Sequence, residues 1–256
     1  MLGVRAYPVA TAVLSADTST LPNAYCADLS EQMRAILKDI KDAQLPLDGV
    51  YTGYLSSAAQ ATTAAQALKL ATLSIVDPIM GDDGQLYPKL TPKWVDAMRA
   101  LCKGATVITP NMTEVALLCG QPYQAVWQLD AIRKCCARLS SICKRGVLTS
   151  VRLEGEDDRL STFVYDEGRI ARIVSPQLKA HYPGSGDVFA TVLMAKLVNN
   201  VPLTDATHFA AAFVHKAIEI SQNLSVAPAE GLALEEMGSF CGQDPLGTTH
   251  QILLYH

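Results

Sequence analysis

Short, continuously apolar runs alternate along most of the chain with segments whose apolar residues recur every three or four positions. Runs such as "TLSIVDP" (72–78) and "ATVITP" (105–110) are short and end at proline, which is typical of strands buried on both faces. Segment 28–43 instead has the spacing of an amphipathic helix. The predicted strands are 4–13, 47–55, 72–78, 105–110 and 145–151, and the predicted helices are 28–43, 56–71, 91–102, 113–120, 130–140, 186–199 and 204–222.

This alternation predicts a mostly parallel sheet with helices on both faces, an α/β fold. Residues 161–174 have the pattern of two strands around a turn and predict a short antiparallel hairpin at one edge. We find no linker, repeat or low-complexity segment, so we expect one domain over residues 1–256. Residues 227–256 are rich in Gly, Pro and Thr, which predicts an irregular tail, in which "QILLY" could form a short strand.

Charge and composition exclude several classes of protein. The net charge is −4 and the longest basic cluster is Lys144–Arg145, so the sequence does not indicate nucleic-acid binding. No apolar run reaches the roughly 18–20 residues of a membrane span, and no signal peptide is evident. The seven cysteines are irregularly spaced without a CxxC pair, which favours a reduced, cytoplasmic protein without a thiolate metal site.

Polar residues follow several of the predicted strands. In open α/β sheets, ligands bind beyond the carboxyl ends of the parallel strands, so these residues should lie on one rim together with the loop at 184–187. They are Tyr54, Asp77, Asn111, Glu114, Thr149 and Ser150.

The segment "YPGSGDVFA" (182–190) places small residues directly before an apolar helix. The amides of Gly184, Ser185 and Gly186 could form an anion hole at the helix start, and Asp187 could take a proton from a substrate hydroxyl. The segment lacks the GxxxxGK[ST] pattern of a P-loop. The alternative is a tight turn with a helix cap.

The other polar residues also have two interpretations each. Asp77 and Glu114 could hold a hydrated Mg²⁺, or Asp77 could form a turn before Pro78 and Glu114 could favour the helix dipole. Asn111 could bind a ligand or cap the helix that follows it. Thr149 and Ser150 could be ordinary strand residues.

Six motifs together give the chain a resemblance to a known family. Four of them resemble the ribokinase-like vitamin kinases, and two more narrow the resemblance to the bacterial pyridoxal/pyridoxamine kinase branch. The four are "VDPIMGDDGQLY" (76–87), "ITPNMTEVALLCG" (108–120), "VLTSV" (147–151) and "YPGSGDVFA" (182–190), and the two are "TAVLSADTST" (11–20) and "VYTGYLSS" (50–57).

The resemblance implies a three-layer ribokinase-like fold and ATP-dependent phosphorylation of the 5′-hydroxymethyl group of pyridoxal, pyridoxine or pyridoxamine. It implies Mg²⁺, leaves a requirement for a monovalent cation open, and implies a homodimer. By position, it makes Asp187 the catalytic base and Gly184, Ser185 and Gly186 the anion hole. It assigns Asp77 and Glu114 to the metal, Asn111, Glu114, Thr149 and Ser150 to the nucleotide, and Ser15, Thr18 and Tyr54 to the vitamer.

The resemblance also implies a strand, a turn and a helix of roughly thirty residues before "LGVRAYP". We therefore expect this chain to lack the family's first βα unit, with weakened stability and vitamer binding. Two alternatives stay open: a hydroxymethylpyrimidine-type kinase, and a truncated nucleotide-binding protein without turnover.

Overall fold

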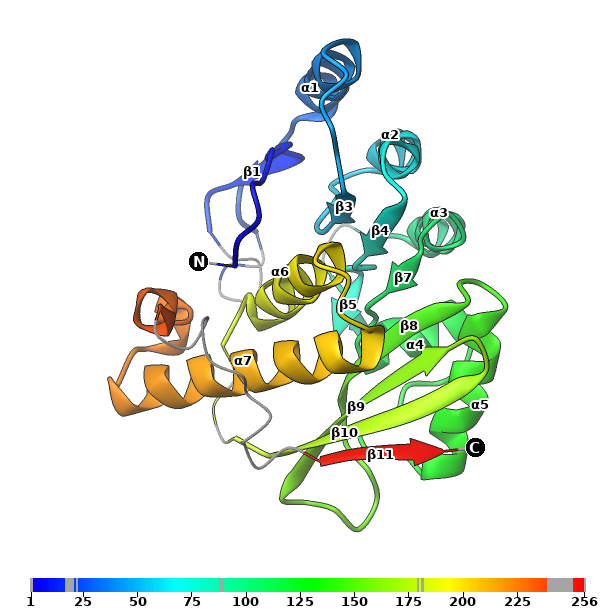
Figure 1. The fold of residues 1–256 in the computed structure, drawn as a ribbon, viewed down its shortest axis with the longest axis vertical. Helices are drawn as coiled ribbons and strands as arrows, with labels where there is room; N and C mark the ends of the chain where they lie inside the picture. Colours follow the sequence, from blue (N-terminus) through cyan, green and yellow to red (C-terminus); the bar gives the residue numbers. More distant parts are fainter. Residues whose placement is uncertain are drawn as a thin grey trace.

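The structure, a computed structural model, describes residues 2–16, 21, 23–87, 90–178, 180, 182–238 and 251–255. Helices lie around a central sheet, with two small hairpins beside it (Figure 1). The strands are β1 (Ala12–Leu14), β2 (Cys26–Asp28), β3 (Gly49–Thr52), β4 (Leu73–Val76), β5 (Gly81–Asp82), β6 (Gln85–Leu86), β7 (Val107–Ile108), β8 (Arg145–Val151), β9 (Arg159–Asp166), β10 (Arg169–Pro176) and β11 (Gln251–Tyr255). The α-helices are α1 (Ser30–Asp42), α2 (Ala58–Ala67), α3 (Pro92–Cys102), α4 (Met112–Cys119), α5 (Leu129–Ser140), α6 (Ser185–Val198) and α7 (Leu203–Asn223).

The central sheet has the order β11-β10-β9-β8-β7-β4-β3. The pairs β3–β4, β4–β7 and β7–β8 are parallel, whereas β8–β9, β9–β10 and β10–β11 are antiparallel. The predicted α/β class is confirmed. The antiparallel edge is longer than the short hairpin that we expected, because β9 and β10 have eight residues each and β11 adds a further strand.

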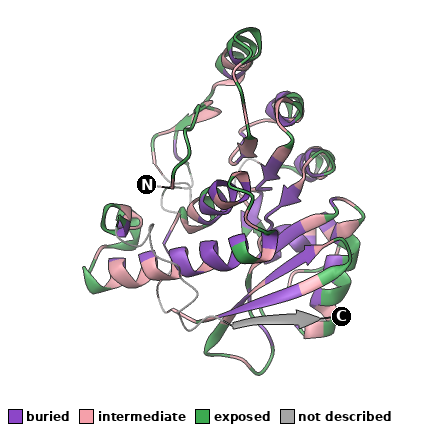
Figure 2. Ribbon diagram, viewed as in Figure 1, coloured by how far each residue is buried: buried purple, intermediate pink, exposed green. Residues whose placement is uncertain are grey.

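The middle of the sheet, from β4 to β10, is buried on both faces (Figure 2). Neighbouring residues of each strand point to opposite sides, so Ile75 packs against α6 and α7, while Val76 packs in the core formed with α2 to α5. Val107 and Ile108 of β7 divide between the two cores in the same way. The continuous apolar runs in the sequence therefore reflect a sheet that is covered on both sides.

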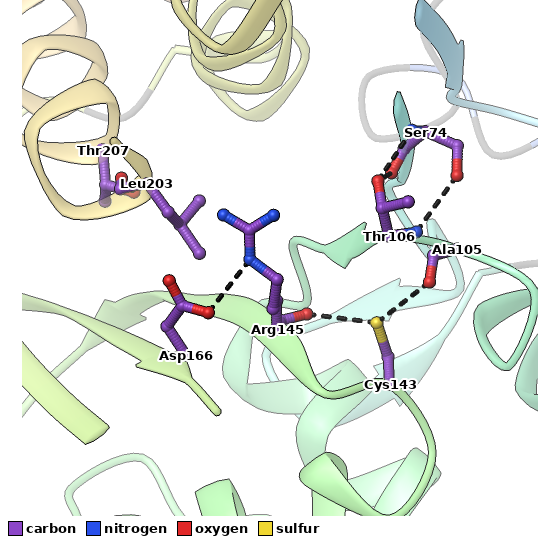
Figure 3. Close-up of polar contacts among 8 residues, drawn as sticks. All are labelled: Ser74, Ala105, Thr106, Cys143, Arg145, Asp166, Leu203 and Thr207. Atoms are coloured by element: carbon purple, nitrogen blue, oxygen red, sulfur yellow. Dashed lines mark hydrogen bonds and ion pairs between the residues drawn. The ribbon is translucent and has the colours of Figure 1, made fainter. Parts of the chain in front are cut away.

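Polar contacts tie the amino ends of the parallel strands together (Figure 3). The Thr106 Oγ1 hydroxyl lies 2.6 Å from the Ser74 carbonyl oxygen and 2.7 Å from the Ser74 amide nitrogen. The Arg145 guanidinium donates to Asp166 Oδ1 over 3.0 Å at the start of β8. These contacts fix the end of the sheet opposite the predicted rim and leave the carboxyl ends for ligands.

Most predicted elements are confirmed, including the Gly120 terminus of α4, which has φ 63°. The predicted strand over 4–13 is wrong for residues 4–11. Only Ala12–Leu14 forms a strand, β1, which pairs with β2. Among the described residues no strand pairs with 4–11, so the backbone of this segment has no partner strand for hydrogen bonding. In the tail, 251–255 forms β11 against β10.

No helix in the described part of the chain is long and apolar enough to cross a membrane.

The β5–β6 hairpin gives a test of the packing beside the rim. A Cβ added at Gly81 would lie 2.0 Å from the backbone oxygen of Gln85. We therefore expect Gly81→Ala to lower the free energy of unfolding by about 1–3 kcal/mol, measured by urea denaturation. Gly238→Ala is the control, because nothing lies within 4 Å of a Cβ there. Equal stability of the two variants would contradict this packing.

Candidate active site

Helix α6 begins beside the carboxyl end of β3. Gly184 precedes it with φ 82°, a conformation that favours glycine, and Asp187 lies in the first turn. Gly49 of β3 lets the helix come close, because a Cβ at this position would lie 2.8 Å from Met194 Sδ and 3.1 Å from Val198 Cγ1. The small residue on the strand thus lets the later turns of the helix pack closely on β3.

The first turn of α6 has amide groups available for an anion. The Ser185 N–H donates to the Tyr182 carbonyl over 3.3 Å, and the Val188 N–H donates to the Gly184 carbonyl over 3.0 Å. Within the described residues, the amides of Gly186 and Asp187 have no backbone acceptor. Of the predicted set of Gly184, Ser185 and Gly186, only the Ser185 amide has a backbone acceptor among the described residues, so the other two remain available as donors.

The Asp187 carboxylate is held from the side of the sheet. Tyr51 Oη donates a hydrogen bond to Asp187 Oδ1 over 3.2 Å. Partial burial of the carboxylate raises the pKa of Asp187, and the hydrogen bond from Tyr51 opposes that shift. The group is thus placed and tuned as a candidate base.

Asp77 follows β4 and is 8% exposed. Its N–H donates to the Thr52 carbonyl over 3.0 Å, which fixes its backbone beside the end of β3. Burial raises the pKa of Asp77 and the charge of Asp187 raises it further, while hydrogen bonds from Thr109 and Tyr51 act in the opposite direction. Asp77 and Asp187 are therefore electrostatic neighbours.

Asn111 and Glu114 form a capping box at the start of α4. Asn111 Oδ1 accepts from the Glu114 N–H over 3.0 Å, and Glu114 Oε2 accepts from the Asn111 N–H over 2.8 Å. Glu114 Oε1 also accepts from the Met80 N–H over 3.0 Å, and Asn111 Nδ2 donates to the Gly81 carbonyl over 2.9 Å. The structural interpretation of these two residues is thus present in the fold.

Glu114 is also part of the same electrostatic group. It is 3% exposed, and burial followed by the charge of Asp77 raises its pKa well above the usual value. The two backbone N–H groups that donate to Glu114, those of Asn111 and Met80, oppose this rise in its pKa. The buried carboxyls of Asp77 and Glu114 thus make a region that favours a cation.

Asp77 and Glu114 could hold Mg²⁺ in an arrangement that includes water and phosphate oxygens. The described residues contain no group of three or more His, Cys, Asp or Glu side chains that could hold a metal ion. Both carboxylate oxygens of Glu114 already accept backbone hydrogen bonds. Mg²⁺ at ATP sites keeps several waters and takes phosphate oxygens, so Asp77 could hold it with Glu114 acting through water.

Thr149 and Ser150 lie where β8 is irregular. Thr149 bridges to Asn111, and its N–H donates to the Pro110 carbonyl over 3.1 Å. Ser150 has φ 57°, and the pairing of β8 with β9 shifts its register between Leu148 and Val151. A non-glycine residue in this region costs about 1–3 kcal/mol and is commonest at functional sites. The structure brings this bulge beside the start of α4.

Two of the three residues predicted to face the substrate ring, Ser15 and Tyr54, lie in the described part of the chain. Ser15 is in the β1–β2 hairpin, where its Oγ accepts from the Tyr25 N–H over 2.9 Å. Thr11 Oγ1 donates to the Tyr54 carbonyl over 2.7 Å, so the hairpin is attached beside Tyr54. Thr18 lies outside the described residues.

Asp28 anchors the same hairpin to the start of α2. Its Oδ2 accepts from Ser56 Oγ over 2.6 Å, and its Oδ1 accepts from the Ser30 N–H over 2.8 Å. Hydrogen bonds from Ser30 and Ser56 lower the pKa of Asp28 to about 2. The hairpin is thus fixed at its base.

Sequence reasoning missed Tyr51 and Gly53. A Cβ at Gly53 would lie 3.1 Å from Tyr51 Oη and 3.6 Å from Asp187 Oδ1, so both residues border the carboxylate. The available signal was the period of two in a strand, which places 49, 51 and 53 on one face.

Comparison with known proteins identifies the family. The family model for phosphomethylpyrimidine kinase matches residues 1–231. The chain belongs to this family. The kinase is 24% identical over 238 residues to the hydroxymethylpyrimidine/phosphomethylpyrimidine kinase of Rhizobium meliloti, covering 90% of this chain and 85% of that one.

Two solved structures resemble the kinase over most of its length. One is from Bacteroides thetaiotaomicron, is assigned to the phosphomethylpyrimidine kinases and was crystallised with pyridoxal. It has a TM-score of 0.90 and 30% identity, over 98% of this chain and 90% of that one. The other, a pyridoxal kinase from Lactobacillus plantarum, has a TM-score of 0.81 and 30% identity, over 90% and 84%. The protein is therefore a kinase of the pyridoxal/hydroxymethylpyrimidine family, as its motifs suggested.

The capping box of α4 can be tested by stability. Asn111→Ala removes the acceptor of the Glu114 N–H and the donor to Gly81, and we expect a loss of about 1–2 kcal/mol in the free energy of unfolding. Thr91→Ala is the matched control, because Thr91 occupies the N-cap of α3 without a side-chain capping bond. Urea denaturation measures both. A similar loss for the two variants would show that the cap contributes nothing.

Proposed function

We propose that the protein transfers the γ-phosphoryl group of ATP to the 5′-hydroxymethyl group of pyridoxal, pyridoxine or pyridoxamine. The observation that carries the proposal is the start of α6. There the Asp187 carboxylate lies in the same turn as the unpaired amides of Gly186 and Asp187. A base and an anion site so close together suit proton removal from a hydroxyl and stabilisation of a transferring phosphoryl group.

In this mechanism Asp187 accepts the hydroxyl proton, and the substrate oxygen attacks the γ-phosphorus as the bond to the ADP oxygen breaks. The helix-start amides of Gly184, Gly186 and Asp187 stabilise charge on the transferring group. Positioning and charge neutralisation supply most of the catalysis in such transfers.

The remaining residues divide between the two substrates. We assign Asn111, Glu114, Thr149 and Ser150 to the nucleotide phosphates, and Ser15, Thr18 and Tyr54 to the vitamer ring. Asp77 would hold Mg²⁺, with Glu114 acting through water, and the ion would neutralise phosphate charge.

The choice of a vitamer rests on the relatives and on Tyr54. The Bacteroides structure holds pyridoxal, and the Lactobacillus protein is a pyridoxal kinase. An aromatic residue at the end of β3 also suits a pyridine ring, since aromatic pairs stack favourably. By the same resemblance we propose a homodimer, which light scattering of the purified protein would test.

A hydroxymethylpyrimidine kinase is the second candidate. The family model and the Rhizobium relative favour it. Both substrates carry a hydroxymethyl group on a nitrogen heterocycle, so the same base and anion site would serve either. ATP consumption with each vitamer and with hydroxymethylpyrimidine separates the two, and the substrate with the higher kcat/KM identifies the activity. ATP binding without turnover of any of them would refute both.

Asp187→Asn tests the base. We expect kcat to fall by about 10²–10⁴-fold, because the amide cannot accept the substrate proton, while ATP affinity stays near the wild-type value. Coupled-assay kinetics and calorimetric titration with ATP measure the two quantities. Asp205→Asn is the control, since Asp205 lies in the first turn of α7. Parallel losses of ATP binding and turnover in Asp187→Asn would contradict the assignment.

Gly186→Val tests the anion site. No protein atom lies within 4 Å of a Cβ at Gly186, so the added side chain should meet the ligand and not the protein. We expect ATP to bind at least about tenfold more weakly, a change of about 1.4 kcal/mol. Gly186→Ala, with a smaller side chain, should give a smaller loss. Normal ATP affinity in the valine variant, measured by calorimetry, would rule out phosphate at this position.

A further inference from the structure

Strand β3 presents alternate residues to α6. Gly49 lies under Met194 and Val198, and Tyr51 packs in the core on the same side of the sheet as α6. Gly53 continues this face beside Asp187. The helix therefore runs along β3, with the Tyr51 hydroxyl beside Asp187 in its first turn.

The Tyr51 hydroxyl lies between two carboxyl groups. It donates to Asp187 Oδ1 over 3.2 Å, and it is also a hydrogen-bonding neighbour of Asp77. The hydroxyl has one proton, so it can donate to one carboxylate at a time. A phenol hydroxyl keeps its proton at neutral pH, so Tyr51 remains a donor to Asp187.

Little else restrains the Asp187 side chain. In the described part of the chain, Tyr51 is the one residue recorded as a side-chain hydrogen-bond partner of Asp187. The neighbouring Gly184 and Gly186 offer no side chain to pack against it, and among the described residues no atom beyond their own local backbone lies within 4 Å of a Cβ at either position. A carboxylate on such an open turn would otherwise sample several rotamers.

Gly53 keeps the contact open. A Cβ at Gly53 would lie 3.1 Å from Tyr51 Oη, closer than most such contacts allow, and 3.6 Å from Asp187 Oδ1. Tyr51 and Gly53, at the end of the β3 segment, thus border the side chain of Asp187. Asp187 lies 136 positions further along the chain than Tyr51.

We propose that Tyr51 is a positioning residue for phosphoryl transfer, holding Asp187 Oδ1 so that Oδ2 faces the substrate hydroxyl. The inference rests on the proposed function. In the reaction, the hydroxyl proton passes to Asp187 Oδ2, the freed oxygen attacks the γ-phosphorus, and ADP leaves. Tyr51 gives up no proton and touches neither substrate, so it acts through the orientation of Asp187 alone.

Tyr51→Phe tests this proposal, since it removes the hydroxyl and keeps the ring in the core. We expect kcat to fall about 10–100-fold, because small misplacements of a catalytic group cost up to about 100-fold. KM for ATP and for the vitamer should stay within about threefold of the wild type, as expected when an interaction acts on the transition state. Tyr165→Phe is the matched control, since Tyr165 is 2% exposed and lies in the other core. It should leave kcat unchanged.

A double-mutant cycle separates positioning from general stabilisation. If Tyr51 acts through Asp187, adding Tyr51→Phe to Asp187→Asn should lower the residual rate by less than about twofold. Single-turnover transfer from radiolabelled ATP measures the slow variants. An unchanged kcat in Tyr51→Phe, or the same fold-loss in the Asp187→Asn background, overturns the proposal while the kinase function stands. A wild-type protein that phosphorylates neither a vitamer nor hydroxymethylpyrimidine refutes the proposed function, and the role of Tyr51 with it.

Discussion

The close contact between α6 and β3 is the constraint on which the candidate site depends. A helix that packs on a sheet normally stands off by the length of the side chains between them. Here Gly49 removes one of those side chains, and Met194 and Val198 occupy the space. At the other end of this contact the helix start lies beside the carboxyl end of β3, and Gly184 turns the backbone there with a positive φ. Asp187, Tyr51 and Asp77 meet because of this packing.

Three buried or partly buried carboxyls near one another would oppose folding unless their charge were offset. The surroundings of the carboxyl groups differ in how far they offset the charge. Glu114 accepts two backbone N–H groups and caps a helix, so its charge is offset within the fold. Burial and the charge of Asp187 raise the pKa of Asp77. The pKa of Glu114 is raised as well, so the two carboxyls together favour a cation, which is consistent with the roles proposed for them toward Mg²⁺.

The residues of the rim could be predicted from the sequence because their positions follow from the topology of a parallel sheet. Parallel strands place their carboxyl ends at one edge, so the residues following β4, β7 and β8 had to be neighbours once the strands were identified. It could not reveal that the Ser185 amide is used by the turn, since that depends on the local backbone. Tyr51 was missed because it lies within a strand and reads as a core aromatic. Its hydroxyl gains a partner only through the approach of α6, a contact between segments far apart in the chain.

The same geometry bears on how this family separates its substrates. A hydroxymethyl group is all that the start of α6 needs to recognise, and pyridine and pyrimidine substrates both have one. Discrimination must therefore come from groups that meet the ring, and the candidates lie around Tyr54 and the β1–β2 hairpin. That hairpin is attached through the Thr11–Tyr54 and Asp28–Ser56 hydrogen bonds, independently of α6. In the proposed function, the hairpin would therefore contribute to ring recognition, while the contact between Tyr51 and Asp187 would serve phosphoryl transfer.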